Sequence, residues 1–144
     1  MLHLIRLSKI HEYIIYLISV IVTISGFVWL YFDFFVRVET EFSLQVHPMQ
    51  NIFLILHGSS SIIFLIILGS VLPIHVYKAW KIKNNRLSGG SFLLLFTILI
   101  LTGIGLFYSA VEDNRRILSV LHWVIGILFP IFFVIHIYFG KFKK

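Results

Sequence analysis

The stretch of sequence that decides the fold is residues 117–140, ILSVLHWVIGILFPIFFVIHIYFG. It contains no Asp, Glu, Lys or Arg, but it carries two histidines, His122 and His136. On an α-helix their spacing corresponds to about 21 Å of rise and about 1400° of rotation, which returns to within about 40° of the start. Both imidazoles therefore project from one stripe of the helix. Polar side chains within a bilayer are costly, so the pattern indicates two stacked ligands for a cofactor.

Three other runs lack charged side chains, namely Tyr13–Phe32, Phe42–Tyr77 and Leu87–Val111. Each reaches the roughly 20 residues that span a bilayer. The chain has 144 residues, of which 59% are hydrophobic, and this composition does not suit a soluble domain. We therefore predict an all-α integral membrane protein, a single domain over 1–144 with helices at about 10–32, 49–77, 87–109 and 116–140. Short connections predict an up-down-up-down four-helix bundle.

The first hydrophobic run is interpreted as a retained helix, because no small-residue cleavage pattern follows it. Pro48 fits the first turn of the second helix. Pro73 is a candidate position for a bend in that helix, and Pro130 predicts a kink in the fourth.

Basic residues are distributed unevenly between the predicted connections. Nine of the twelve fall in the N-terminal segment, the connection between the second and third helices, and the C-terminal tail: Arg6, Lys9, Lys78, Lys81, Lys83, Arg86, Lys141, Lys143 and Lys144. The other connections combine Arg37, Arg115 and Arg116 with Asp33, Glu39, Glu41, Glu112 and Asp113. The positive-inside rule then predicts cytoplasmic termini in a bacterial inner membrane. The net charge of +6 is explained by topology and does not indicate nucleic acid.

The chain contains no cysteine. This excludes disulfides, cysteine-ligated iron–sulfur clusters, thiolate-ligated haem and covalent c-type haem attachment within the chain. Any haem must therefore be non-covalent and be held by histidine or methionine.

The predicted helices sort the histidines into two depths. His57 and His122 lie at the outer level, whereas His11, His75 and His136 lie at the inner level. His3 and His47 fall in the tail and a loop and are interpreted as surface residues. Bis-histidine haem b needs two imidazoles on opposite sides of the macrocycle. We expect two haems, with His57–His122 as the outer ligands and His11–His136 as the inner ligands. Each of these four histidines would be an axial ligand of a haem iron. His75 is the alternative inner ligand, or a contact to a haem propionate or quinone oxygen.

Small residues lie in or near the predicted spans, at Gly26, Gly58, Gly69, Gly103 and Gly126. Such residues allow close approach of two helices or of a porphyrin.

Several short motifs resemble the bacterial cytochrome b561-type proteins, which include the b-type subunits of nickel–iron hydrogenases and formate dehydrogenases. The motifs are RLSKIH at 6–11 with Ser25-Gly26, LHG at 56–58, Thr102-Gly103, and the fourth-helix pair His122 and His136. The resemblance implies that His11 and His136 hold the cytoplasmic-side haem and that His57 and His122 hold the periplasmic-side haem.

Two positions depart from this pattern. Glu12 stands where the family usually has tryptophan. The segment PIHVYKAW at 73–80 resembles a related group of small four-helix membrane cytochromes that carry two histidines on the second helix. The identity of the inner ligand therefore stays open between His11 and His75.

These patterns predict a di-haem b electron-transfer subunit. It would pass electrons between a redox partner at the periplasmic face, such as a dehydrogenase, a reductase or a cytochrome c, and the quinone pool. Glu12, His75 and Lys78 are candidate quinone contacts. One alternative is a self-sufficient superoxide:quinone oxidase. This activity would need a funnel of basic residues at the outer face. Arg37, Arg115 and Arg116 could form one, but the acidic residues in the same connections argue against it. Another is a haem-free assembly or transport subunit whose histidines bind metal ions or relay protons.

Overall fold

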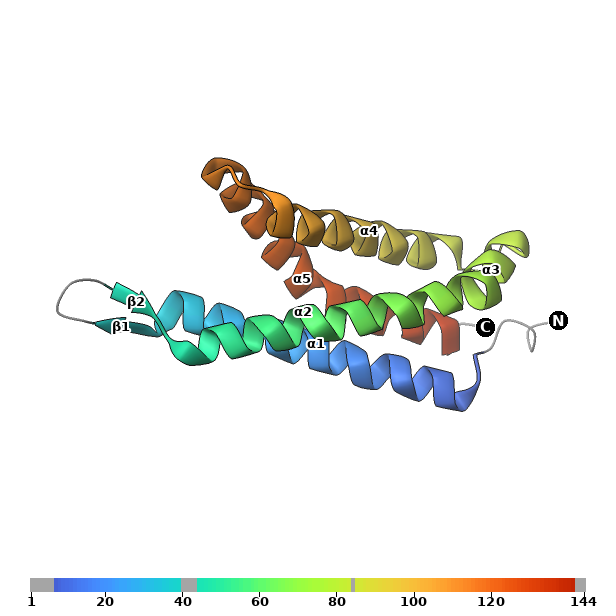
Figure 1. The fold of residues 1–144 in the computed structure, drawn as a ribbon. Coiled ribbons are helices and arrows are strands. Elements are labelled where there is room, and N and C mark those ends of the chain that lie inside the picture. The colour runs from blue at the N-terminus through green and yellow to red at the C-terminus, as the bar shows by residue number, and fades with distance from the viewer. Residues whose placement is uncertain (1–6, 40–43, 84, 142–144) are drawn as a thin grey trace. The chain divides into compact units, whose positions relative to one another are not determined.

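The computed structural model describes residues 7–39, 44–83 and 85–141 (Figure 1). Within this part of the chain, four helical stretches are long and apolar enough to cross a membrane: Lys9–Phe35, Pro48–Lys81, Arg86–Tyr108 and Glu112–Lys141. The prediction of a helical membrane protein with four spans is thus confirmed. His3, Arg6, Glu41, Lys143 and Lys144, which entered the sequence analysis, lie outside the described residues.

The chain divides into two compact units, Met1–His75 and Val76–Lys144. The first contains helix α1 (Lys9–Phe35), strands β1 (Arg37–Glu39) and β2 (Leu44–Val46), and helix α2 (Pro48–Val71). The second contains helices α3 (Tyr77–Lys81), α4 (Arg86–Tyr108) and α5 (Glu112–Lys141). Each unit is built around one pair of long helices, and we call these pairs the first and second hairpins.

The first hairpin is antiparallel. Contacts join Asp33 to Gln50 near the connection, His57 to Val22 in the middle, and His11 to Ser70 at the far end. Later residues of α1 thus contact earlier residues of α2. Each residue on α1 therefore has a defined partner level on α2.

The described residues of the connection between α1 and α2 include two short strands that were not predicted. β1 pairs antiparallel with β2, from Arg37 opposite Val46 to Glu39 opposite Leu44. Next to β2, the His47 side chain caps α2 by accepting a hydrogen bond from the Met49 amide at 3.1 Å. Pro48 occupies the first turn of α2, as predicted. His47 thus has a structural role as a helix cap.

The second predicted helix is interrupted near Pro73. α2 ends at Val71, a π-helix η2 covers Leu72–Val76, and α3 continues to Lys81. Proline has no amide hydrogen and cannot make the regular i→i−4 bond. A single π turn at the proline accommodates this loss locally. The predicted end at 77 was too early, since the apolar helical stretch runs on to Lys81.

The second hairpin is also antiparallel. At one end, the side-chain amide of Asn85 donates a hydrogen bond to the Phe139 carbonyl at 3.1 Å. Nearer the other end, Thr102 contacts His122. Between these levels, rings from α4 (Phe92 and Phe96) pack against rings from α5 (Phe129 and Phe133) at centroid distances of 5.3–6.1 Å. The α4–α5 register is therefore held by aromatic packing with a polar contact on either side.

α5 begins at Glu112 rather than at 116, and it continues through Pro130 without a break. Glu112 and Asp113 lie in its first turn, where acidic side chains interact favourably with the exposed amides of the helix end. The last connection is therefore shorter than predicted, and Arg115 and Arg116 belong to the helix.

Most apolar side chains stay exposed on the hairpins, for example Leu87 at 88% and Phe107 at 84%. The buried set instead includes polar residues such as Ser19, Ser25 and Thr102, whose hydroxyls donate to the carbonyl four residues earlier. Satisfying a hydroxyl within its own helix allows its burial without an unpaired donor. The exposed apolar surface suits lipid or other membrane helices.

Candidate functional site: the histidines of the two hairpins

His57 projects from α2 toward α1. Its Nδ1 atom lies 3.0 Å from the carbonyl oxygen of Val22 and 3.4 Å from the Ser25 hydroxyl oxygen. A carbonyl oxygen can only accept a hydrogen bond, so Nδ1 must be the donor. In a neutral imidazole this assignment leaves the lone pair on Nε2. His57 therefore has the tautomer that ligates a metal through Nε2.

Gly26 makes room for this ring on α1. A Cβ atom at Gly26 would lie 3.1 Å from Cε1 and 3.2 Å from Nδ1 of His57. Both distances are shorter than ordinary van der Waals contact. A side chain at position 26 would therefore require the His57 ring to shift by a few tenths of an ångström.

The second hairpin holds His122 of α5 in a similar way. Its Nδ1 atom lies 2.9 Å from the hydroxyl oxygen of Thr102. That hydroxyl has a single proton, which it donates to the Ile98 carbonyl at 2.7 Å. It must therefore accept from the imidazole, so Nδ1 of His122 is also the protonated nitrogen. A Cβ atom at Gly103 would lie 3.4 Å from Cε1 of His122, and so Gly103 lies against the ring.

His136 also turns toward α4. Its ring stacks on Phe92 with a centroid distance of 5.5 Å and an interplanar angle of 11°. A Cβ at Gly89 would lie 3.7 Å from its Cε1 atom, which is ordinary contact. His122 and His136 thus both contact α4, at two levels along the same hairpin.

His11 is held by its other ring nitrogen. Nε2 of His11 lies 2.9 Å from the Ser70 hydroxyl, and this hydroxyl donates to the Ile67 carbonyl at 2.6 Å. Ser70 must therefore accept from Nε2, which places the lone pair of a neutral His11 on Nδ1. This is the opposite tautomer to that of His57 and His122. His75, the alternative inner ligand, lies in the π-helix η2.

The predicted pairs His57–His122 and His11–His136 each take one histidine from each unit. Among the described residues, no group of three or more His, Asp or Glu side chains could hold a metal ion. A protein-bound zinc ion generally needs three or four protein ligands. Bis-histidine haem needs only two, because the porphyrin supplies the other four nitrogens. The imidazoles of His57 and His122, with the lone pair on Nε2, are of the kind that can ligate a haem iron.

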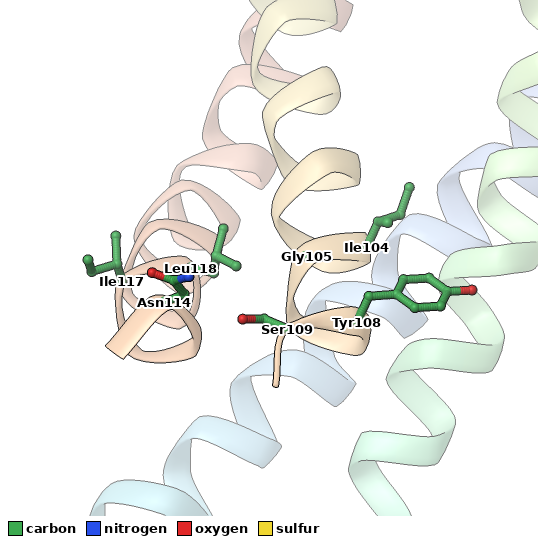
Figure 2. Close-up of a pocket in the computed structure, with 7 residues that line it drawn as sticks. All are labelled: Ile104, Gly105, Tyr108, Ser109, Asn114, Ile117 and Leu118. Atoms are coloured by element: carbon green, nitrogen blue, oxygen red, sulfur yellow. The ribbon is translucent and has the colours of Figure 1, made fainter. Parts of the chain in front are cut away.

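A shallow, open groove of about 500 Å³ lies at the end of α4 and the start of α5 (Figure 2). Its lining comprises Ile104, Gly105, Tyr108, Ser109, Asn114, Ile117 and Leu118. None of the candidate ligands lines it. The two helices approach closely beside it, since a Cβ atom at Gly105 would come within 2.8 Å of Leu118 Cδ1. This end of the hairpin is held by close helix packing.

No role was predicted from sequence for the hydroxyls of Ser25 and Thr102. A signal was available, because each lies directly before a glycine in the first long helix of its hairpin.

Comparison of the chain with family models, characterised proteins and solved structures finds no match.

Proposed function

We propose that this protein is a di-haem b electron-transfer subunit of a bacterial inner membrane. It passes electrons between a redox partner at the periplasmic face and the quinone pool. The observation that carries this proposal is the matched setting of His57 and His122. In each hairpin one imidazole is held through Nδ1–H, which leaves the lone pair of the neutral ring on Nε2. Metal-ligating histidines almost always use their other ring N–H in this way.

In this proposal the outer haem is ligated by His57 and His122. The inner haem is ligated by His136 and by His11, with His75 as the alternative. His11 must give up its Ser70 contact to ligate through Nε2. The two hairpins pack as an up-down-up-down bundle with both termini in the cytoplasm, as the basic connections favour.

The chain contributes orientation and environment. The Nδ1–H bonds of His57 and His122 fix the ring planes and make Nε2 a stronger donor. The apolar helices exclude water from the ligands. The haem supplies the one-electron chemistry when it is bound. At the inner level, Glu12, His75 and Lys78 are the candidates for contacts to a quinone, and their changes to alanine should lower quinone reduction if the site is there.

The test is a reduced-minus-oxidised spectrum of the purified full chain, with haem quantified per chain. We expect two b-type haems. His57→Ala and His122→Ala should each remove the outer haem, and His136→Ala should remove the inner one. Comparing His11→Ala with His75→Ala identifies the remaining ligand. His47→Asn is the matched control, because asparagine preserves a helix cap and position 47 ligates no haem in this scheme.

A purified, folded protein without Soret absorption after expression with ample haem would contradict the proposal. It would favour the haem-free assembly or transport alternative. Quinone reduction by superoxide without any partner would instead favour the self-sufficient oxidase.

A further inference from the structure

We infer that Ser25-Gly26 and Thr102-Gly103 are equivalent positioning pairs, one in each hairpin. Each pair seats one histidine with Nδ1 protonated and Nε2 presented as the donor to a metal. Only the identity of that metal as a shared haem iron rests on the proposed function. The positioning itself concerns His57 and His122 within their own hairpins.

The first argument is the hydrogen bonding of the two hydroxyls. Ser25 donates to the carbonyl four residues earlier at 2.7 Å and lies 3.0 Å from the carbonyl three residues earlier. The corresponding distances for Thr102 are 2.7 and 3.2 Å. In both cases the proton is used within the helix. The hydroxyl oxygen can then act toward the histidine only as an acceptor.

The second argument is the order of the parts. In both hairpins the hydroxyl residue directly precedes the glycine that contacts the ring. The pair lies on the first long helix of each hairpin, and the histidine lies on the second. The hydroxyl lies 3.4 Å from Nδ1 of His57 in the first hairpin and 2.9 Å from Nδ1 of His122 in the second, while the glycine admits Cε1. The same two-residue device is therefore used twice.

The two pairs differ in one way that can be tested. His57 donates mainly to the Val22 carbonyl at 3.0 Å, and the Ser25 hydroxyl is the longer contact at 3.4 Å. For His122 the short contact at 2.9 Å is to the Thr102 hydroxyl itself. Removing the Thr102 hydroxyl should therefore disturb His122 more than removing the Ser25 hydroxyl disturbs His57.

Each hydroxyl has a matched control in its own helix. Thr97 of α4 donates to the Leu93 carbonyl at 2.9 Å, and Ser19 of α1 donates to the Ile15 carbonyl at 2.7 Å. Thr97→Val and Ser19→Ala thus remove a helix-bonded hydroxyl of the same type, but at positions away from His57 and His122. Thr102→Ser keeps the hydroxyl and should therefore behave like the original protein.

The first readout does not depend on haem. The full chain, labelled with ¹⁵N-histidine, is purified from cells grown with and without haem supply and examined by NMR. We expect His57 and His122 to be Nδ1-protonated in the haem-free protein, and Thr102→Val to shift the Nδ1–H signal of His122 alone. Thr97→Val should leave both signals in place, and Ser25→Ala should move the His57 signal by a smaller amount.

The second readout is the midpoint potential of the outer haem. A hydrogen bond from Nδ1–H increases electron donation by the imidazole and stabilises ferric iron. Thr102→Val should therefore raise the potential, whereas Thr102→Ser and Thr97→Val should leave it unchanged.

The outcomes separate the inference from the proposed function. Nδ1-protonated histidines in a protein that never binds haem would support the positioning pairs and overturn the haem function. Two bound haems with Thr102→Val indistinguishable from Thr97→Val in both readouts would overturn the positioning pairs and leave the haem function standing. Nε2-protonated His57 and His122 in the haem-free protein would also overturn the positioning pairs.

Discussion

At the scale of single residues, Gly26 makes the sharpest demand in the first hairpin. We expect Gly26→Ala to displace the His57 ring and lower the outer haem content, because the added methyl would lie 3.1 Å from the ring. Overpacking of this kind costs about 1–3 kcal/mol of stability. The measurements are haem per chain and the thermal midpoint in detergent.

Gly69→Ala is the control for this change. Within the first hairpin, no atom lies within 4 Å of a Cβ at that position. Alanine also favours helix over glycine by about 1 kcal/mol. Gly69→Ala should therefore keep its haem and melt no lower than the original protein. Equal haem content in the two variants would show that His57 does not need the space at Gly26.

The same scale explains what sequence could and could not tell about the site. His57, His122 and His136 are visible as candidate ligands because each is a costly polar residue in an apolar run, whereas His11 lies just before one. Which ring nitrogen is protonated depends on the atom opposite, such as the Val22 carbonyl or the Thr102 hydroxyl. That partner follows from the register of two helices, which periodicity within one helix does not specify.

At the scale of elements, Asn85 joins the start of α4 to the end of α5. Its backbone has φ 46°, in the left-handed region, and its side chain donates to the Phe139 carbonyl. We expect Asn85→Ala to lower the free energy of unfolding by about 1–2 kcal/mol, about 1 from the lost hydrogen bond and the rest because alanine tolerates the left-handed region less well than asparagine. Reversible denaturation in mixed micelles measures this difference.

Asn85→Gly separates the two contributions. Glycine adopts a positive φ without strain, so this variant should lose only the part due to the hydrogen bond. If glycine and alanine at position 85 were equally destabilising, the backbone conformation would contribute nothing.

The long helices were predictable from sequence because their apolar runs exceed the membrane thickness, and the predicted bounds differ from the structure by only a few residues. The π-helix η2 and the β1–β2 pair were not predicted. Pro73 signals a missing hydrogen bond but does not specify whether a bend or a π turn follows. Strands of three residues, such as Arg37–Glu39, are too short to produce a recognisable alternation.

At the scale of the whole molecule, the distribution of basic residues predicts which ends of the hairpins face the cytoplasm. The absence of cysteine makes this testable with single-cysteine variants. We expect Ser109→Cys, between α4 and α5, to react with a membrane-impermeant maleimide in spheroplasts. Lys81→Cys, at the end of α3, should react only after the membrane is permeabilised, because basic connections stay inside.

The control for non-specific reaction is the Ser109→Cys variant with its thiol blocked before the maleimide is added. Labelling of Lys81→Cys in intact spheroplasts, together with protection of Ser109→Cys, would reverse the proposed orientation. The proposed redox partner would then have to meet the protein at the opposite face.

The antiparallel register of each hairpin also has a consequence for the order of events during folding. Asp33 and Gln50 are 17 residues apart, Thr102 and His122 are 20 apart, and His11 and Ser70 are 59 apart. Closing a short loop costs less entropy than closing a long one, so contacts near each connection form first and the hairpin closes toward its open end. The contacts that hold His57 and His122 therefore form before the contact that holds His11, so the proposed outer level would be complete before the proposed inner level.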